Sequence, residues 1–267
     1  MVAFNPLVFP TLLAAGALYA AGYRLAEERP ALRNRLLAAS AVLCLPGLFF
    51  LLYYLHLVRE PAWYVEFRSL PGVETASALW GLPFGLLARE KPFAGTWQKL
   101  RLSLLLVFVP FAKPVLLPLG GAVFNDAWED GVCLQSTMAT CGPCSLATVL
   151  TSLGLPATER DVARAAFSAM TGTESWYLLR TARRRGLKAR VRASAALSDV
   201  SAPAILGVRL GGGAGHFIVL LGAERGRRVL GDPLAGRLLL TDAEFAKAYD
   251  FTGWAMEFSR PGDTISR

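Results

Sequence analysis

The sequence predicts an α+β domain, residues 125–267, that follows a region of transmembrane helices, residues 1–124. Three observations support this division. The 267-residue chain is 54% hydrophobic and only 18% charged, which is more apolar than an ordinary soluble protein. The long uncharged runs all occur in the first half. From about residue 125 the apolar segments become short and are separated by glycine, proline and charge, as in a compact domain.

The charge of the chain points to a membrane rather than to nucleic acid. The net charge is +8 and the mean hydropathy is +0.40. A basic chain can bind nucleic acid. Here, however, many of the basic residues flank the apolar runs, which is typical of membrane topology. We therefore expect a lipid bilayer as a partner and no nucleic acid.

Three runs in the first half are long and apolar enough to cross a bilayer, which takes about 20 residues. They cover residues 5–23, 36–58 and 102–124. The first run has no basic residues before it, as expected for an anchor rather than a cleaved signal peptide. A weaker run, residues 69–88, contains Glu74 together with several glycines and prolines.

The basic residues of the first half decide how the weaker run is interpreted. They gather in the segments 24–35 and 89–101. If residues 69–88 cross the bilayer, both segments lie inside, as the positive-inside rule requires. If they do not cross, one of the two clusters must be exported. We therefore favour four crossings over three, in a bacterial inner (cytoplasmic) membrane, with the second half of the chain extracytoplasmic.

The second half is expected to contain helices first and strands afterwards, which is the order of an α+β fold. Helices are predicted from Cys141, from Thr158 and over residues 174–185, the last being closed by Gly186. Its arginine-rich end is expected to face solvent. Thr241 and the glutamate three residues later form a capping box that starts a short final helix. The predicted strands are LKARVRA, PAILGVRL, HFIVLLGA, RRVLGD, GRLLL and WAMEFS.

The tetrad Cys141-Gly142-Pro143-Cys144 is the feature that carries chemistry, and it has two interpretations. It matches the redox motif of thioredoxins, which would make the protein a thiol-disulfide oxidoreductase using Cys141 and Cys144. That motif follows a strand in a βαβ unit, whereas residues 136–140 are mostly small and polar. Alternatively, Cys141 is a hydrolytic nucleophile whose thiolate is favoured by the start of a helix.

The remaining parts of a hydrolytic site are present in the second half. Of the two histidines, His56 lies in an apolar run and His216 opens a predicted strand, where it can act as a base. Asp232 follows the next strand, so two adjacent strands could bring it to the imidazole. Gln135 lies six residues before Cys141 and can supply an oxyanion donor.

The segments QSTMATCGPCSLATVL, GHFIVLLG and GDPLAG resemble the papain-like cysteine peptidases of the bacteriocin-processing, double-glycine leader type. The resemblance covers residues 131–258. It implies a papain-like domain with N-terminal helices and an antiparallel sheet. It also implies the catalytic residues Cys141, His216 and Asp232, with Gln135 completing the oxyanion hole. Two features depart from the family: Cys144 replaces a small residue, and the chain has no phosphate-binding loop of an export ATPase.

The sequence therefore predicts a membrane-anchored cysteine endopeptidase that needs no cofactor and no metal. Its expected substrate is an exported or membrane-associated peptide or protein, cut after small residues such as Gly-Gly. The alternative is a catalytically silent or redox-controlled domain that binds a peptide or partner. In an oxidising compartment, Cys144 or Cys133 could form a disulfide with Cys141 and silence it. A zinc site formed by these three cysteines and His216 would have unusual ligand spacing.

Overall fold

The structure is a computed structural model that describes residues 4–28, 30–57, 60–88 and 95–263. The chain divides into two compact units. We call residues 4–60 and 71–116 the helical unit, and residues 61–70 and 117–263 the C-terminal unit. This division differs from the predicted boundary at residue 124, because the segments 61–70 and 117–124 cluster with the C-terminal unit.

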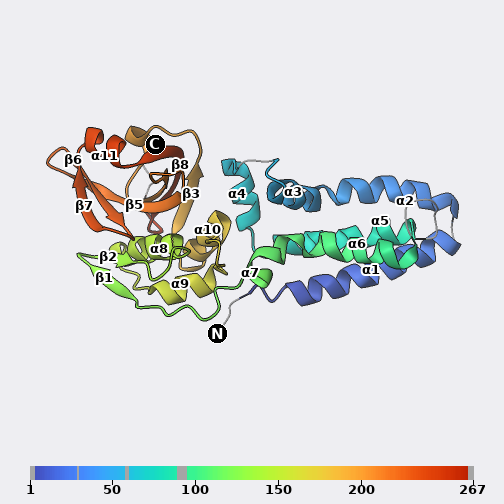
Figure 1. Ribbon diagram of the computed structural model, residues 1–267. Coiled ribbons are helices and arrows are strands. Elements are labelled where there is room, and N and C mark those ends of the chain that lie inside the picture. Colours follow the sequence, from blue (N-terminus) through green and yellow to red (C-terminus); the bar gives the residue numbers. More distant parts are fainter. Residues whose placement is uncertain (1–3, 29, 58–59, 89–94, 264–267) are drawn as a thin grey trace. The chain divides into compact units, whose positions relative to one another are not determined.

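The helical unit is built from α-helices and 3₁₀ helices (Figure 1). Its elements are α1 (Val8–Glu28), α2 (Pro30–Leu43), α3 (Leu45–Tyr54), η1 (Val73–Trp80), α5 (Gly81–Leu86), α6 (Thr96–Phe108), η2 (Val109–Phe111) and α7 (Ala112–Leu116). Gly81 and Gly85 bring α5 against α1. A Cβ atom on Gly81 would lie 2.1 Å from the Ala15 carbonyl oxygen, and one on Gly85 would lie 2.2 Å from the Tyr19 carbonyl oxygen. This GxxxG spacing therefore permits backbone contact, as small residues do between packed helices.

The helices of this unit are more interrupted than the sequence predicts. The run 36–58 is divided at Cys44, because α3 begins at Leu45 with Pro46 in its first turn. The run 69–88 forms the 3₁₀ helix η1 and the short α5, and the run 102–124 is helical only up to Leu116. Within the described ranges, no helix by itself combines the length and the apolar composition of a membrane span. Residues 31–43 and 45–54 meet both conditions only as a pair bent by 50°.

Some of the charges used to predict the topology, Arg29, Arg59, Arg89 and Lys91, lie outside the described residues. Lys99 is described, and it is 6% exposed rather than part of an open basic loop. Its ammonium group donates a 2.5 Å hydrogen bond to the carbonyl oxygen of Leu87, just after α5. A cation at this position is favoured by the helix dipole.

The C-terminal unit contains two antiparallel sheets and a set of helices, so the predicted α+β class is confirmed. The strands β1 (Ala127–Glu129) and β2 (Val132–Leu134) form a hairpin. The larger sheet has the order β3-β8-β4-β5-β6-β7. Its strands are β3 (Lys188–Arg192), β4 (Ala204–Arg209), β5 (Gly215–Glu224), β6 (Arg227–Asp232), β7 (Gly236–Leu240) and β8 (Asp250–Ser259).

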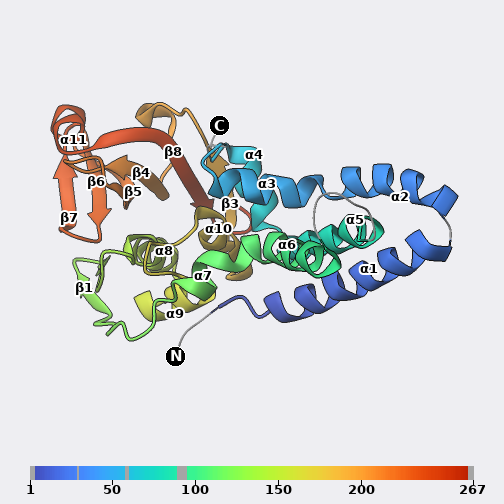
Figure 2. The same ribbon diagram turned by 45° about the vertical axis from the view of Figure 1, so that its right-hand side comes forward.

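Helices cover both faces of the larger sheet (Figures 1 and 2). One face carries α8 (Cys141–Ser152) and α10 (Ser175–Arg184), on which α9 (Glu159–Ala165) packs, and the other carries α11 (Asp242–Ala248). Residues 142–150 of α8 are all buried, as expected for a helix at the centre of a domain. The hydroxyl group of Ser145 donates to the carbonyl oxygen of Phe217 and fixes α8 to β5.

The helices of the C-terminal unit begin and end at the residues that local sequence features predict. The Thr158 side chain accepts a hydrogen bond from the Asp161 N–H at the start of α9. Thr241 and Glu244 form the reciprocal capping box of α11. Gly186 follows α10 with φ of +88°, a left-handed conformation that glycine adopts without steric cost. The predicted strands are present as well.

Helix α4 (Ala62–Ser69) belongs to the C-terminal unit and packs against α10. Arg180 is 3% exposed, and its guanidinium donates to the carbonyl oxygens of three consecutive residues, Arg68, Ser69 and Leu70. These groups lie at the C-terminus of α4, where backbone carbonyls have no partner within the helix. The prediction that this arginine-rich segment faces solvent is therefore wrong for Arg180.

Candidate active site

Cys141 is the first residue of α8, and it is partly exposed although residues 142–150 are buried. The backbone N–H groups of a first helical turn have no intrahelical acceptor, and the helix dipole is positive there. Both effects stabilise a thiolate. The position of Cys141 therefore combines access from solvent with a local preference for negative charge.

The two residues after Cys141 explain why the helix begins there. Pro143 lies in the first turn, where its missing N–H removes no intrahelical hydrogen bond. Gly142 allows close packing, because a Cβ atom at this position would lie 2.9 Å from Cδ1 of Leu178 on α10. The Cys-Gly pair thus presents a thiol at a helix end that sits tightly against the neighbouring helix.

The structure brings His216 and Asp232 together. His216 is the second residue of β5 and Asp232 is the last residue of β6, and these strands are neighbours in the sheet. Nε2 of the imidazole lies 2.8 Å from Oδ1 of the carboxylate. The residues are 6% and 3% exposed, so water is largely excluded from the pair.

Asp232 accepts two further hydrogen bonds. The backbone N–H of Leu234 donates to Oδ1 over 2.8 Å, and the phenol of Tyr249 donates to Oδ2 over 2.5 Å. Burial by itself would raise the pKa of Asp232. The hydrogen bonds from His216, Tyr249 and Leu234 outweigh that effect and lower the pKa below its ordinary value. Asp232 is therefore a carboxylate at neutral pH.

Two neighbouring side chains, those of Asp232 and Cys141, raise the pKa of His216. Burial lowers the pKa of His216, but the hydrogen bonds to Asp232 and to the Cys141 side chain more than offset this effect. The negative charges of the same two groups add to the increase, and the pKa rises to about 9. At neutral pH His216 is thus an imidazolium placed between the sulfur of Cys141 and the carboxylate of Asp232.

Gln135 follows β2 directly and is held at both its backbone and its side chain. Its backbone N–H donates to the carbonyl oxygen of Pro233 over 2.9 Å. Its amide Nε2 donates to the carbonyl oxygen of Thr137 over 2.8 Å. An amide group carries two protons. One proton fixes the side chain, and the second is left for another acceptor, as an oxyanion donor requires.

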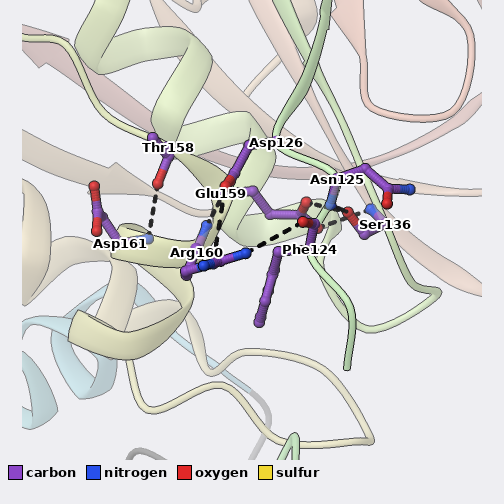
Figure 3. A network of polar contacts seen from close by, with 8 residues as sticks. All are labelled: Phe124, Asn125, Asp126, Ser136, Thr158, Glu159, Arg160 and Asp161. Atoms are coloured by element: carbon purple, nitrogen blue, oxygen red, sulfur yellow. Dashed lines mark hydrogen bonds and ion pairs between the residues drawn. The ribbon is translucent and has the colours of Figure 1, made fainter. Parts of the chain in front are cut away.

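Glu159, the first residue of α9, supports the segment that carries Gln135 (Figure 3). It is fully buried. Its Oε1 accepts a 2.8 Å hydrogen bond from the backbone N–H of Ser136, and its Oε2 accepts from the hydroxyl group of the same residue. That hydroxyl oxygen in turn accepts from the backbone N–H of Asn125. Glu159 therefore fixes the residue next to Gln135.

Cys144 has a different environment from Cys141. It is fully buried beside Cys133 and Glu159, and the hydrogen bond to Cys133, burial and the charges of both neighbours raise the pKa of its thiol well above the ordinary value. A thiol in this state is a poor nucleophile. Cys44, Cys133, Cys141 and Cys144 are all free thiols.

Tyr249 and Glu159 are the functional candidates that sequence reasoning missed. Tyr249 follows α11 and lies 17 positions after Asp232, and no motif connects the two. Glu159 stands in the first turn of a helix, where an acidic residue is ordinary. In the part of the chain that the structure describes, no three His, Cys, Asp or Glu side chains are arranged to hold a metal ion.

Two solved structures match about half of this chain. One is a double glycine motif protease from an AMS/PCAT transporter in complex with the leader peptide. It is 25% identical with a TM-score of 0.43, over 49% of this chain and 91% of that protein. The other is the peptidase domain of Streptococcus ComA, a bi-functional ABC transporter involved in a quorum sensing pathway. It is 21% identical with a TM-score of 0.43, over 49% of this chain and 98% of that domain.

Sequence comparisons assign the C-terminal unit to a family. Residues 130–261 match the model of the Peptidase C39 family. An uncharacterized protein of Methanothermobacter thermautotrophicus is 32% identical over 135 residues, which are 51% of this chain and 92% of that protein. A protein of Methanothermobacter marburgensis is 34% identical over 136 residues, with the same coverage. The chain belongs to the Peptidase C39 family.

Proposed function

We propose that this protein is a cysteine endopeptidase with Cys141 as its nucleophile. The Cys141 thiolate attacks the carbonyl carbon of a peptide bond, and the carbonyl oxygen becomes an oxyanion. The free amide proton of Gln135 and the backbone N–H of Cys141 stabilise that charge. The imidazolium of His216 then donates its proton to the leaving amine as the C–N bond breaks, which leaves a thioester on Cys141.

The second half of the proposed reaction reverses these roles. A water molecule attacks the thioester carbon while the neutral His216 accepts its proton. The C–S bond breaks, the peptide leaves with a new carboxyl group, and the thiolate–imidazolium pair is restored. Asp232 keeps the imidazole oriented and stabilises its positive charge throughout, in the way that the carboxylate of a triad does.

One observation carries this proposal. A buried histidine bonded to a buried carboxylate lies beside a cysteine that opens a helix, and the cysteine is the partly exposed member of the three. A purely structural cysteine has no need of a charged imidazole. The second cysteine of the tetrad is buried and its thiol pKa is raised, so Cys141 is the better nucleophile of the two.

We extend the proposal to the substrate and the location. The substrate is an exported or membrane-associated peptide cut after small residues, as the resemblance to double-glycine leader peptidases implies. The helical unit attaches the enzyme to a bacterial inner membrane, with the C-terminal unit extracytoplasmic. The uncharged run of residues 36–58 and the basic segment 24–35 that precedes it support this part.

A thiol-directed activity probe tests the nucleophile. We expect the reduced full-length protein to be labelled, Cys141→Ala to lose the label, and Cys144→Ala and Cys133→Ala to keep it. His216→Gln should slow labelling strongly without changing the fold. Labelling that survives Cys141→Ala but not Cys144→Ala contradicts the assignment. Absence of labelling in the reduced wild type favours a silent domain that binds a peptide.

The substrate and the location need separate experiments. Mass spectrometry of membrane and secreted peptides from cells carrying Cys141→Ala should show an uncut precursor that wild-type cells lack. Alkaline extraction of membranes should leave the protein in the pellet, and a reporter fused to the C-terminus should be active outside the cytoplasm. Recovery in the soluble fraction contradicts the membrane attachment and leaves the peptidase proposal standing.

A further inference from the structure

The carboxylate of Asp232 has a partner outside the Cys141–His216–Asp232 set. The phenol oxygen of Tyr249 lies 2.5 Å from Oδ2, whereas His216 and the backbone of Leu234 use Oδ1. Tyr249 is 8% exposed. Three donors from β5, from the turn after β6 and from the end of α11 therefore fix both oxygens of one buried carboxylate.

The direction of the Tyr249 hydrogen bond follows from protonation. Burial, together with the hydrogen bond to Asp232 and its negative charge, raises the pKa of Tyr249 above its ordinary value. The phenol therefore stays protonated at neutral pH and donates to the carboxylate, which only accepts when ionised. A hydrogen bond to a charged acceptor is stronger than one between neutral groups.

The fold holds Tyr249 firmly in place. The backbone N–H of Tyr249 donates to the carbonyl oxygen of Phe245 over 2.9 Å, so the tyrosine closes α11. Its ring packs on that of Phe245 with centroids 5.5 Å apart. Both rings belong to the hydrophobic cluster that fills this face of the sheet. Helix α11, which contributes no group to the proposed reaction, thus supports the residue that reaches Asp232.

We propose that Tyr249 is a positioning residue, which holds the Asp232 carboxylate in the orientation that His216 needs. This inference rests on the proposed peptidase function and adds a fourth residue to its machinery. It also assigns a role to α11, whose capping box and aromatic packing hold the Tyr249 phenol against the Asp232 carboxylate.

Removing the Tyr249 phenol should raise the pH at which activity is lost on acidification. Among the described residues, the titratable groups that act on Asp232 are His216 and Tyr249, and those that act on His216 are Asp232 and Cys141. The phenol is one of the groups that lower the pKa of Asp232. Without it, the carboxylate is protonated at a higher pH, and His216 loses its counterion at that pH. The acid limit of activity should therefore move upward.

The test compares Tyr249→Phe with Phe245→Leu in the purified full-length protein. Tyr249→Phe removes one oxygen atom and keeps the ring, whereas Phe245→Leu weakens the packing and keeps the phenol. We expect Tyr249→Phe to lower the second-order rate constant of probe labelling about tenfold, mostly through the maximal labelling rate, and to move the acid limb to higher pH. Phe245→Leu should lower Tm and leave the acid limb where it is. Equal acid limbs in wild type and Tyr249→Phe overturn the inference.

A second measurement does not depend on activity. The chain has two histidines, so ¹³C-labelled histidine gives two signals, and His56→Gln identifies that of His216. In wild type, protonation of Asp232 at acid pH should perturb the His216 signal, and in Tyr249→Phe the perturbation should occur at higher pH. An unchanged midpoint overturns the inference even if the protein proves inactive. An upward shift in an inactive protein supports the positioning role and counts against the peptidase function alone.

Discussion

The backbone N–H of Gln135 donates a 2.9 Å hydrogen bond to the carbonyl oxygen of Pro233. This bond joins the segment that carries the amide donor to the turn that follows Asp232. On its other side, the Gln135 segment is fixed by Glu159 through Ser136. The proposed oxyanion donor is therefore tied both to the turn that follows Asp232 and, through Ser136, to the carboxylate of Glu159.

Glu159→Gln should loosen the Gln135 segment. The amide group cannot accept both Ser136 hydrogen bonds, because only one of its two polar atoms is an acceptor. We expect the maximal rate of probe labelling, or the kcat of peptide cleavage, to fall about tenfold, and the free energy of unfolding to fall by about 1–3 kcal/mol. Asp161→Asn, an exposed change in the same helix, is the matched control and should alter neither value. Equal effects of the two variants would argue against a role for Glu159.

The stability of the folded protein should depend on pH through His216. The pKa of this histidine is raised to about 9 from an ordinary value of about 6.5. The protonated form is favoured by the folded state, so its contribution to stability is complete below pH of about 6.5 and is lost as the pH rises through about 9. Tm measured between pH 6 and 10 should fall over this window. In His216→Gln the fall should be smaller, and an identical pH profile of the two proteins would contradict the assigned ion pair.

The thiols should react in a fixed order. Cys141 is partly exposed, whereas Cys133 and Cys144 are buried and the pKa of Cys144 is raised. Iodoacetamide added to the native reduced protein should modify Cys141 first, and Cys133 and Cys144 only after unfolding in denaturant. Peptide mapping by mass spectrometry identifies the modified residue. A Cys141–Cys144 disulfide in the folded protein would support the redox alternative instead.

Arg180→Ala should destabilise the C-terminal unit. The substitution leaves the three carbonyl groups at the end of α4 without their donor. A hydrogen bond to a charged group contributes about 1.5–3 kcal/mol, so we expect a loss of about 2–4 kcal/mol in the free energy of unfolding. Arg184→Ala, which changes an exposed arginine of the same helix, should cost less than about 0.5 kcal/mol. Denaturant unfolding of both variants measures the difference.

The elements of the C-terminal unit could be predicted from sequence because local residues determine them. Thr158 and Thr241 cap helices through atoms three positions away, and Gly186 ends a helix through its own backbone conformation. The His216–Asp232 pair was also within reach, because the ends of two successive strands meet in an antiparallel sheet. These features depend on spacing along the chain, which the sequence displays.

The roles of Tyr249 and Glu159 depend on tertiary contacts, which the spacing of residues along the chain does not predict. Tyr249 reaches Asp232 only because α11 folds back over the sheet, and Glu159 reaches Ser136 only because α9 packs against the Gln135 segment. In the helical unit, apolar composition predicts that each apolar run forms one continuous helix. The break before Pro46 follows from local backbone chemistry that a composition argument overlooks.

The membership of α4 in the C-terminal unit has a consequence for how the chain is connected. The chain passes between the two units near residues 60, 70 and 116 rather than at a single linker. A fragment starting at residue 117 would lack α4, expose the Trp176 indole that packs on Tyr64, and lose the three carbonyl acceptors that the 61–70 segment offers to Arg180. A peptidase fragment cut from this protein should therefore need the 61–70 peptide, added back as a separate chain, to recover its full stability.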